Sequence, residues 1–272
     1  MRINRPATLS VRALAIAYLA LLLLAPLGLV FYRTFEHGFS VAFNWISTPA
    51  AVSALWLSLL IAVIAVPLNT IFGIGCALVL VRGKRRGRRV LDALLDLPFV
   101  VSPVIIGLAL LLVYGQGSIV GDFFLHRGTQ VIFAVPGMVL ATVFVSLPFV
   151  VREVAPVLLE LGDEQEQAAA TLGASGWQTF WRITLPSIRW GVAYGVVLTT
   201  ARALGEIGAV LVVSSNVAGS TLTLPLLIYQ RDSQIGSDSL TGVYSASTEL
   251  ALLSLLVLLA MTLLGSRRKD SA

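Results

Sequence analysis

The stretch ALWLSLLIAVIAVPLNTIFGIGCALVLV, residues 54–81, contains 28 consecutive residues without a charged side chain. It is followed directly by RGKRRGRR, residues 82–89, in which six of the eight residues are basic. A helix of about 20 apolar residues crosses the hydrocarbon core of a bilayer, so the first stretch is long enough to span it. Basic loops stay on the cytoplasmic side of a membrane. The two stretches therefore predict a transmembrane helix that ends at a cytoplasmic loop.

The composition extends this interpretation to the whole chain. Of the 272 residues, 57% are hydrophobic and 12% are charged, and the mean hydropathy is +0.90. A soluble domain carries about 25% charged residues, and a disordered chain carries few apolar ones, so both classes are excluded. The chain has one cysteine, Cys76, and two histidines, His37 and His126, which are far apart. No disulfide, metal site or bound cofactor is expected on this chain.

Six segments are apolar and long enough to span a membrane. With the N-terminus inside, fifteen basic residues of the connections face the cytoplasm and three face outside, which fixes the orientation. Topology and contact with anionic membrane lipid explain the basic loop, so nucleic-acid binding is not expected. The predicted organisation is a cytoplasmic N-terminus (1–12), a six-span all-α domain (13–265) and a cytoplasmic C-terminal tail (266–272). The predicted spans are 13–32, 54–81, 91–114, 131–151, 190–213 and 244–265.

The longest cytoplasmic connection, 152–189, has structure of its own, mainly in segment 160–186. Acidic residues precede an alanine run, which favours a helix, and Gly173 is placed to end that helix in a left-handed conformation. Ser175 is placed to cap a second short helix, and Pro186 is expected to stop it. The segment is either an interfacial hairpin without a partner or a docking element for a cytoplasmic protein.

The spacing within this segment resembles the E-A-A-x3-G-x9-I-x-L-P motif of bacterial ABC-importer permeases. In that family the motif forms a coupling helix that docks into the ATPase subunit. The first position departs from the motif, because Gln167 stands where the family has glutamate. The adjacent Glu166 lies about 100° away around the helix, so it need not replace that glutamate. The matching positions are Ala168, Ala169, Gly173, Ile183, Leu185 and Pro186.

Three further stretches are similar to the CysW-type sulfate/thiosulfate permeases. They are LPFVVSPV (97–104), SLPFVVREVAPV (146–157) and LPSIRWGVAYGVVLTTARALGEIGAV (185–210). The ARALGEIGA part is shared with molybdate permeases, which leaves a molybdate/tungstate permease as the alternative. The resemblance implies a type I importer in the bacterial inner membrane. Its other parts would be a second, CysT-like permease, a homodimeric CysA-like ATPase that binds ATP and Mg, and an extracytoplasmic sulfate-binding protein.

No catalytic or ATP-binding motif is present. The G-x4-G-K-[ST] phosphate loop is missing, and Ser214 and Ser215 have no histidine base in the same region, so an intramembrane hydrolase is disfavoured. An ion-coupled carrier is a better rival, because several ionisable residues lie in or at the spans: Asp92, Asp96, Arg202, Glu206 and Glu249. A passive membrane anchor would leave those charges unexplained. A carrier would move substrate alone, whereas a permease needs its ATPase.

Arg202 and Glu206 lie near the middle of the fifth predicted span, where charged side chains are costly. Their i, i+4 spacing places them on one helix face. They are interpreted either as a neutralised pair that fixes the helix or as residues that line a path for an anion. Asp92 and Asp96 are expected to pair with the nearby basic loop. The outer connection, 214–242, is either a solvated loop or, as the resemblance implies, a candidate surface for the binding protein.

Overall fold

A computed structural model describes residues 5–83, 87–234 and 237–266. Every regular element in these ranges is a helix, in agreement with the predicted all-α class. Residues 84–86 of the basic loop and 267–272 of the predicted tail lie outside the described residues. The elements are α1 (Arg5–Phe35), α2 (Phe39–Ile46), α3 (Pro49–Arg82), α4 (Arg88–Val100), α5 (Pro103–Tyr114), α6 (Ile119–Leu125), α7 (Val135–Leu161), α8 (Glu164–Thr171), α9 (Gly176–Thr179), the π-helical turn η1 (Phe180–Thr184), α10 (Leu185–Leu204), α11 (Gly208–Val213), α12 (Leu224–Asp232) and α13 (Ser237–Ser266).

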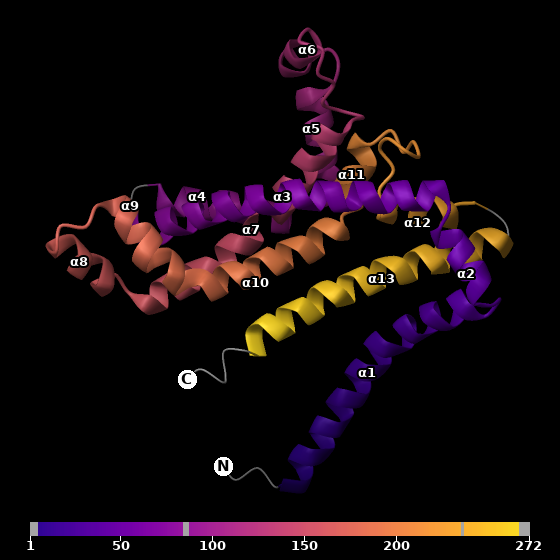
Figure 1. The fold of residues 1–272 in the computed structure, drawn as a ribbon, viewed down its shortest axis with the longest axis horizontal. Coiled ribbons are helices and arrows are strands. Elements are labelled where there is room, and N and C mark those ends of the chain that lie inside the picture. The colour runs from indigo at the N-terminus through magenta and orange to yellow at the C-terminus, as the bar shows by residue number, and fades with distance from the viewer. Residues whose placement is uncertain (1–4, 84–86, 235–236, 267–272) are drawn as a thin grey trace.

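The centre of the fold is the mutual packing of α3, α7 and α10 (Figure 1). Val150 of α7 is fully buried and lies against glycines of both neighbouring helices. A Cβ added at Gly73 of α3 would lie 2.6 Å from the Val150 Cβ, and one at Gly195 of α10 would lie 2.9 Å from the Val150 Cα. Small residues let membrane helices approach closely, and here they bring three backbones together.

Helix α1 diverges from this bundle along most of its length (Figure 1). None of its most apolar 18-residue stretch, within Arg12–Phe35, is buried. Near its C-terminal end, the Thr34 hydroxyl lies 2.7 Å from the Thr248 hydroxyl of α13, and both side chains are buried. A helix with this much uncovered apolar surface requires lipid or another protein around it.

Length and hydropathy support four or five spans among the described residues, fewer than the six predicted. Four single helices qualify, within α1, α3, α7 and α13, and the bent pair of α4 and α5 supplies a fifth if it is one span. The helix boundaries also differ from the predicted span boundaries. Helix α3 begins five residues before the predicted span 54–81, and α7 continues ten residues past the predicted span 131–151.

The predicted span 91–114 is divided between α4 and α5, whose axes differ by 110°. The break falls at Val101 and Ser102, which adopt extended backbone conformations immediately before Pro103. A residue that precedes proline is disfavoured in the helical region, and proline is well suited to the first turn of the next helix. The proline therefore redirects the chain, whereas Pro67 and Pro148 lie inside continuous helices.

The predicted span 190–213 is also divided. Helix α10 ends at Leu204, and the short helix α11 begins at Gly208. Neither helix qualifies as an apolar span, and no bent pair that includes them qualifies in the described part of the chain. The N–H of Gly205 still bonds to the Ala201 carbonyl, and the chain then leaves the helix at Glu206. Sequence periodicity alone did not reveal this interruption.

Candidate functional site

Two regions contain the candidate functional residues. The first is the α8–α9 hairpin, which we define as α8, α9 and η1 (residues 164–184). Figure 1 shows it projecting at one end of the molecule, opposite the end that carries α2 and α12. The second is the interruption between α10 and α11, where Arg202 and Glu206 lie.

The turn of the hairpin is a Schellman motif. Gly173 has a φ of 81°, and its N–H bonds to the Ala170 carbonyl at 3.0 Å. The Ala174 N–H bonds to the Ala169 carbonyl, also at 3.0 Å. These bonds satisfy the last carbonyls of α8, and the positive φ is open to glycine without strain. The predicted left-handed conformation of Gly173 is confirmed.

The second arm begins with a capping box. The Ser175 hydroxyl accepts from the Gln178 N–H at 3.3 Å, and the Gln178 side chain accepts from the Ser175 N–H at 2.9 Å. This reciprocal pair satisfies two donors that a helix start leaves free. The predicted capping role of Ser175 is confirmed. Both bonds lie at the surface, so they shape the hairpin without help from a buried core.

The expectation that Pro186 ends this second helix is wrong. The chain passes from α9 through the π-helical turn η1 directly into α10, and Pro186 occupies the first turn of α10. Proline is accepted in the first turn of a helix, where its missing N–H is not needed. The wider π turn immediately precedes it, and such turns are frequent at functional sites. The hairpin is thus continuous with a long helix of the bundle.

The motif positions are divided between the surface and the interior of the hairpin. Gln167, Ala168, Gly173 and Pro186 are exposed, Ala169 is buried, and Ile183 and Leu185 are half-buried. The tip adds exposed apolar side chains, with Leu172 88% and Trp177 70% exposed. The ring of Trp177 contacts that of Trp181 at 5.5 Å between centroids. Exposed apolar groups at a projecting tip are typical of a protein interaction surface.

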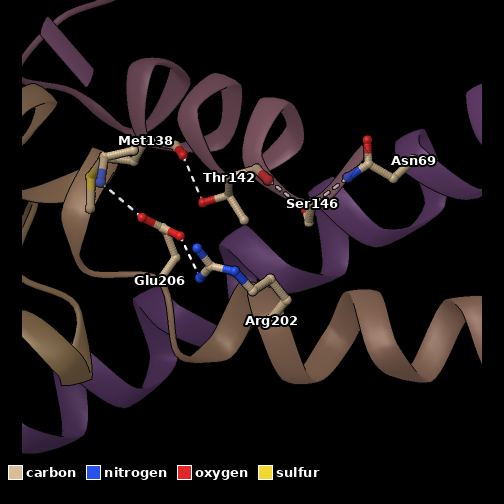
Figure 2. Close-up of polar contacts among 7 residues, drawn as sticks. Asn69, Met138, Thr142, Ser146, Arg202 and Glu206 are labelled. Carbon is tan, nitrogen blue, oxygen red and sulfur yellow. Dashed lines mark hydrogen bonds and ion pairs between the residues drawn. The ribbon is translucent and has the colours of Figure 1, made fainter. Parts of the chain in front are cut away.

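Arg202 and Glu206 form the predicted i, i+4 ion pair, with 2.6 Å between Nη1 and Oε2 (Figure 2). The Glu206 side chain is 2% exposed and the Arg202 side chain 31%. The other carboxylate oxygen, Oε1, accepts from the Ala209 N–H at 2.8 Å. Glu206 therefore satisfies a free N–H in the first turn of α11 as well as pairing with α10.

A row of polar groups runs along α7, which packs against both α10 and α11 (Figure 2). The Thr142 hydroxyl donates to the Met138 carbonyl, and the Ser146 hydroxyl donates to the Thr142 carbonyl. Asn69 of α3 donates to the Ser146 hydroxyl at 2.8 Å, and its buried Oδ1 has no hydrogen-bond partner among the described residues. Sequence reasoning missed this row. An amide inside the uncharged stretch 54–81 was the available signal, because polar groups at that depth are rare.

The acidic pair Asp92 and Asp96 binds Arg152, and the expectation that it pairs with the basic loop is wrong for the described residues. Arg152 lies 2.9 Å from the Asp92 carboxylate and also contacts that of Asp96. The contact joins α4 to α7 across more than fifty residues of sequence, which local spacing does not report. No group of three His, Cys, Asp or Glu side chains suited to a metal ion occurs in the described part of the chain.

At the opposite end, Arg231 of α12 is buried and donates to the Gly242 carbonyl at 3.0 Å and to the Thr48 hydroxyl at 3.1 Å. Its guanidinium also lies over the Trp45 ring, 5.1 Å from the centroid. Burial lowers the pKa of Arg231, and the negative charge of Glu249 opposes that shift. The Arg231 side chain therefore fastens the connection 214–242 to Thr48, the residue that caps α3, and to α13.

Comparisons with known proteins agree with this architecture. The family described as "Binding-protein-dependent transport system inner membrane component" matches residues 69–270. "Sulfate transport system permease protein CysW" of Synechocystis sp. is 48% identical over 98% of this chain and 97% of its own length. The protein of the same name from Escherichia coli (strain K12) is 44% identical over 92% of this chain and 85% of its own length.

The solved structures agree on the fold. A bacterial ABC transporter involved in the import of the acidic polysaccharide alginate contains a chain that superimposes with a TM-score of 0.79. The overlap covers 97% of both chains at 18% sequence identity, so this likeness concerns the fold. The family match spans most of the sequence and includes the hairpin and the interruption between α10 and α11. The chain therefore belongs to the family of binding-protein-dependent transport system inner membrane components, as a multi-pass, all-α permease of the inner membrane.

Proposed function

We propose that the chain is one of two different permease subunits of an ATP-driven importer that passes sulfate, and also thiosulfate, into the bacterial cell. The observation that carries the proposal is the similarity to CysW sulfate permeases over almost the whole chain, at 44–48% identity. This similarity includes the segment 185–210, in which Arg202 and Glu206 lie.

The second permease subunit is of the CysT type. A "Sulfate transport system permease protein CysT" from Synechocystis sp. is 35% identical to this chain, which supports two related subunits that pack as a pair. An extracytoplasmic sulfate-binding protein would deliver the anion, since a solved relative of this fold is a complex with a periplasmic protein that holds its substrate. The outer connection, anchored through Arg231, is the surface for that contact.

The ATPase is a separate homodimer of the CysA type, and it binds ATP and Mg. The α8–α9 hairpin faces the cytoplasm and docks into it through the surface formed by Gln167, Ala168 and the apolar tip. The support for this assignment is structural: the hairpin projects, its turn is fixed by its own hydrogen bonds, and its second arm continues into α10. A movement of the ATPase would therefore act first on the hairpin, whose second arm continues through η1 into α10.

The anion passes between the two permease subunits, beside the interruption of α10. The Arg202 side chain is 31% exposed in this single chain, so it remains partly open to a passing dianion. Glu206 neutralises part of its charge and keeps the anion from binding too tightly. A path must hold an ion well enough for entry and weakly enough for exit.

Uptake of labelled sulfate, thiosulfate and molybdate by cells that lack and then regain this chain tests the proposal. Sulfate uptake that depends on the chain, and that competing thiosulfate reduces, is expected. Restored molybdate uptake without sulfate uptake would favour the molybdate/tungstate alternative. Uptake by the purified chain in vesicles without an ATPase would show an ion-coupled carrier and contradict the proposal.

A further inference from the structure

Four segments meet at the C-terminal end of α3, around the side chain of Arg82. Its Nε lies 3.0 Å from Oε2 of Glu166, in the first turn of α8, and its Nη2 donates to the Gly162 carbonyl at the end of α7. The other carboxylate oxygen of Glu166, Oε1, accepts from the Thr184 hydroxyl of η1 at 2.9 Å. One carboxylate thus joins the hairpin to α3 and joins the two arms of the hairpin to each other.

This junction is packed and largely shielded from water. The side chains of Arg82 and Glu166 are 24% and 23% exposed, and Thr184 is buried. The cavity that remains between Arg82, Glu166, Leu158 and Ile183 has a volume of about 10 Å³, which is close to the smallest that holds a water molecule. The ion pair is therefore screened less than a pair at the surface would be.

The hairpin needs such a lateral contact, because both of its connections to the bundle lack regular α-helical structure. On one side the chain leaves α7 through Gly162, whose φ of 65° and ψ of −169° are accessible essentially to glycine alone. On the other side it enters α10 through the π-helical turn η1. With these two connections alone, the hairpin could change its angle to α3 and α7 when pushed.

The neighbouring Gln167 is exposed at the surface, whereas the half-buried Glu166 faces Arg82. The two side chains are about 100° apart on the helix, so one faces a partner and the other faces the bundle. The acidic group at position 166 is therefore not a displaced copy of the motif glutamate. Its carboxylate instead binds groups of this subunit itself, Arg82 and Thr184.

We propose that Glu166 is a positioning residue whose carboxylate fixes the α8–α9 hairpin to α3 and η1, so that movement of the hairpin is passed to the bundle. The inference rests on the proposed function, since it describes how the hairpin transmits the action of an ATPase. When the junction is intact, the hairpin and the inner end of α3 move together. When it is broken, the hairpin turns about Gly162 and η1 while the bundle stays behind.

The test is the amount of sulfate imported per ATP hydrolysed, measured in proteoliposomes that contain the whole complex with its binding protein. Glu166→Gln should lower this ratio by about fivefold or more while ATP hydrolysis continues, a change of the size expected for lost coupling between sites. Arg82→Met should also lower the ratio, and the effect of the double variant should be smaller than the sum of the two single effects, because both variants remove the same Arg82–Glu166 contact. Thr184→Val removes a single bond and should lower the ratio less.

Glu36→Gln is the matched control, since it makes the same change in an exposed pair with Arg33 at the other end of the molecule. It should leave the ratio unchanged. The proposal is overturned if Glu166→Gln lowers uptake and hydrolysis in parallel with an unchanged ratio, or if the double variant shows the sum of two independent losses. It is also overturned if Thr184→Val, like the other variants, merely prevents assembly. Absence of ATP-dependent sulfate uptake by the unaltered complex would instead contradict the proposed function.

Discussion

Removing one partner of the Arg202–Glu206 pair should destabilise the protein unequally, depending on which partner is removed. In Arg202→Met the Glu206 carboxylate stays at 2% exposure without its cation. Loss of one partner from a buried pair costs about 3–5 kcal/mol, because the remaining charge is not hydrated. In Glu206→Gln the remaining charged side chain, that of Arg202, is 31% exposed and so less fully buried than Glu206, and the loss should be smaller than in Arg202→Met.

The double variant Arg202→Met with Glu206→Gln separates this explanation from simple loss of packing. Glutamine can still accept from the Ala209 N–H, which Glu206 now binds at 2.8 Å, and no unpaired charge remains. The double variant should therefore recover about 2 kcal/mol relative to Arg202→Met alone. Exchange of the two charges is a poorer probe, because an arginine at position 206 could not accept that N–H.

The assay is equilibrium unfolding in mixed detergent micelles, followed by tryptophan fluorescence. Arg182→Met, which alters an exposed arginine of η1 directly before the same helix, is the control and should change the stability by less than about 0.5 kcal/mol. Equal losses for the two single variants would refute the reasoning, because they would show that the burial of Glu206 does not decide the energy. A double variant as unstable as Arg202→Met would refute it as well.

Three further predictions concern the hairpin, the core and the topology. Gly173→Val places a β-branched residue at a φ of 81° with open space around it, so it should destabilise the turn by about 1–2 kcal/mol through the backbone alone and reduce binding of the ATPase in a pull-down assay. Gly195→Ala brings a Cβ within 2.9 Å of the α7 backbone and should cost about 1–3 kcal/mol in the unfolding assay, while Gly75→Ala, which meets no atom within 4 Å, should cost nothing; equal effects would contradict the close packing. In a cysteine-free background, Ser175→Cys should be labelled only from the cytoplasmic side and His126→Cys only from outside, and outside labelling at position 175 would exclude docking to a cytoplasmic ATPase.

The α8–α9 hairpin could be predicted from sequence because its structure is local. The Gly173 turn and the Ser175 cap each depend on residues within five positions, and their hydrogen bonds close within the segment. Local preferences of this kind are expressed in the sequence itself. The continuation through Pro186 was missed because a proline can stop one helix or start another, and the choice depends on the chain before it.

The remainder depends on contacts between distant parts of the chain. Asp92 and Asp96 contact Arg152, which lies far from them in the sequence, and Glu166 contacts Arg82 across 84 positions. Hydropathy detects apolar length but does not detect an interruption that a buried carboxylate stabilises, as Glu206 does at the start of α11. For the same reason the i, i+4 spacing predicted the Arg202–Glu206 ion pair correctly but did not show which partner is buried.

ATP-dependent accumulation of labelled sulfate in proteoliposomes tests the central claim most directly. The vesicles should contain this chain, its second permease subunit and the ATPase, with the binding protein outside and ATP within. Sulfate should accumulate inside when all components and ATP are present, and accumulation should stop when the ATPase or ATP is omitted. Accumulation that persists without the ATPase, driven by an ion gradient across the vesicle membrane, would contradict the account.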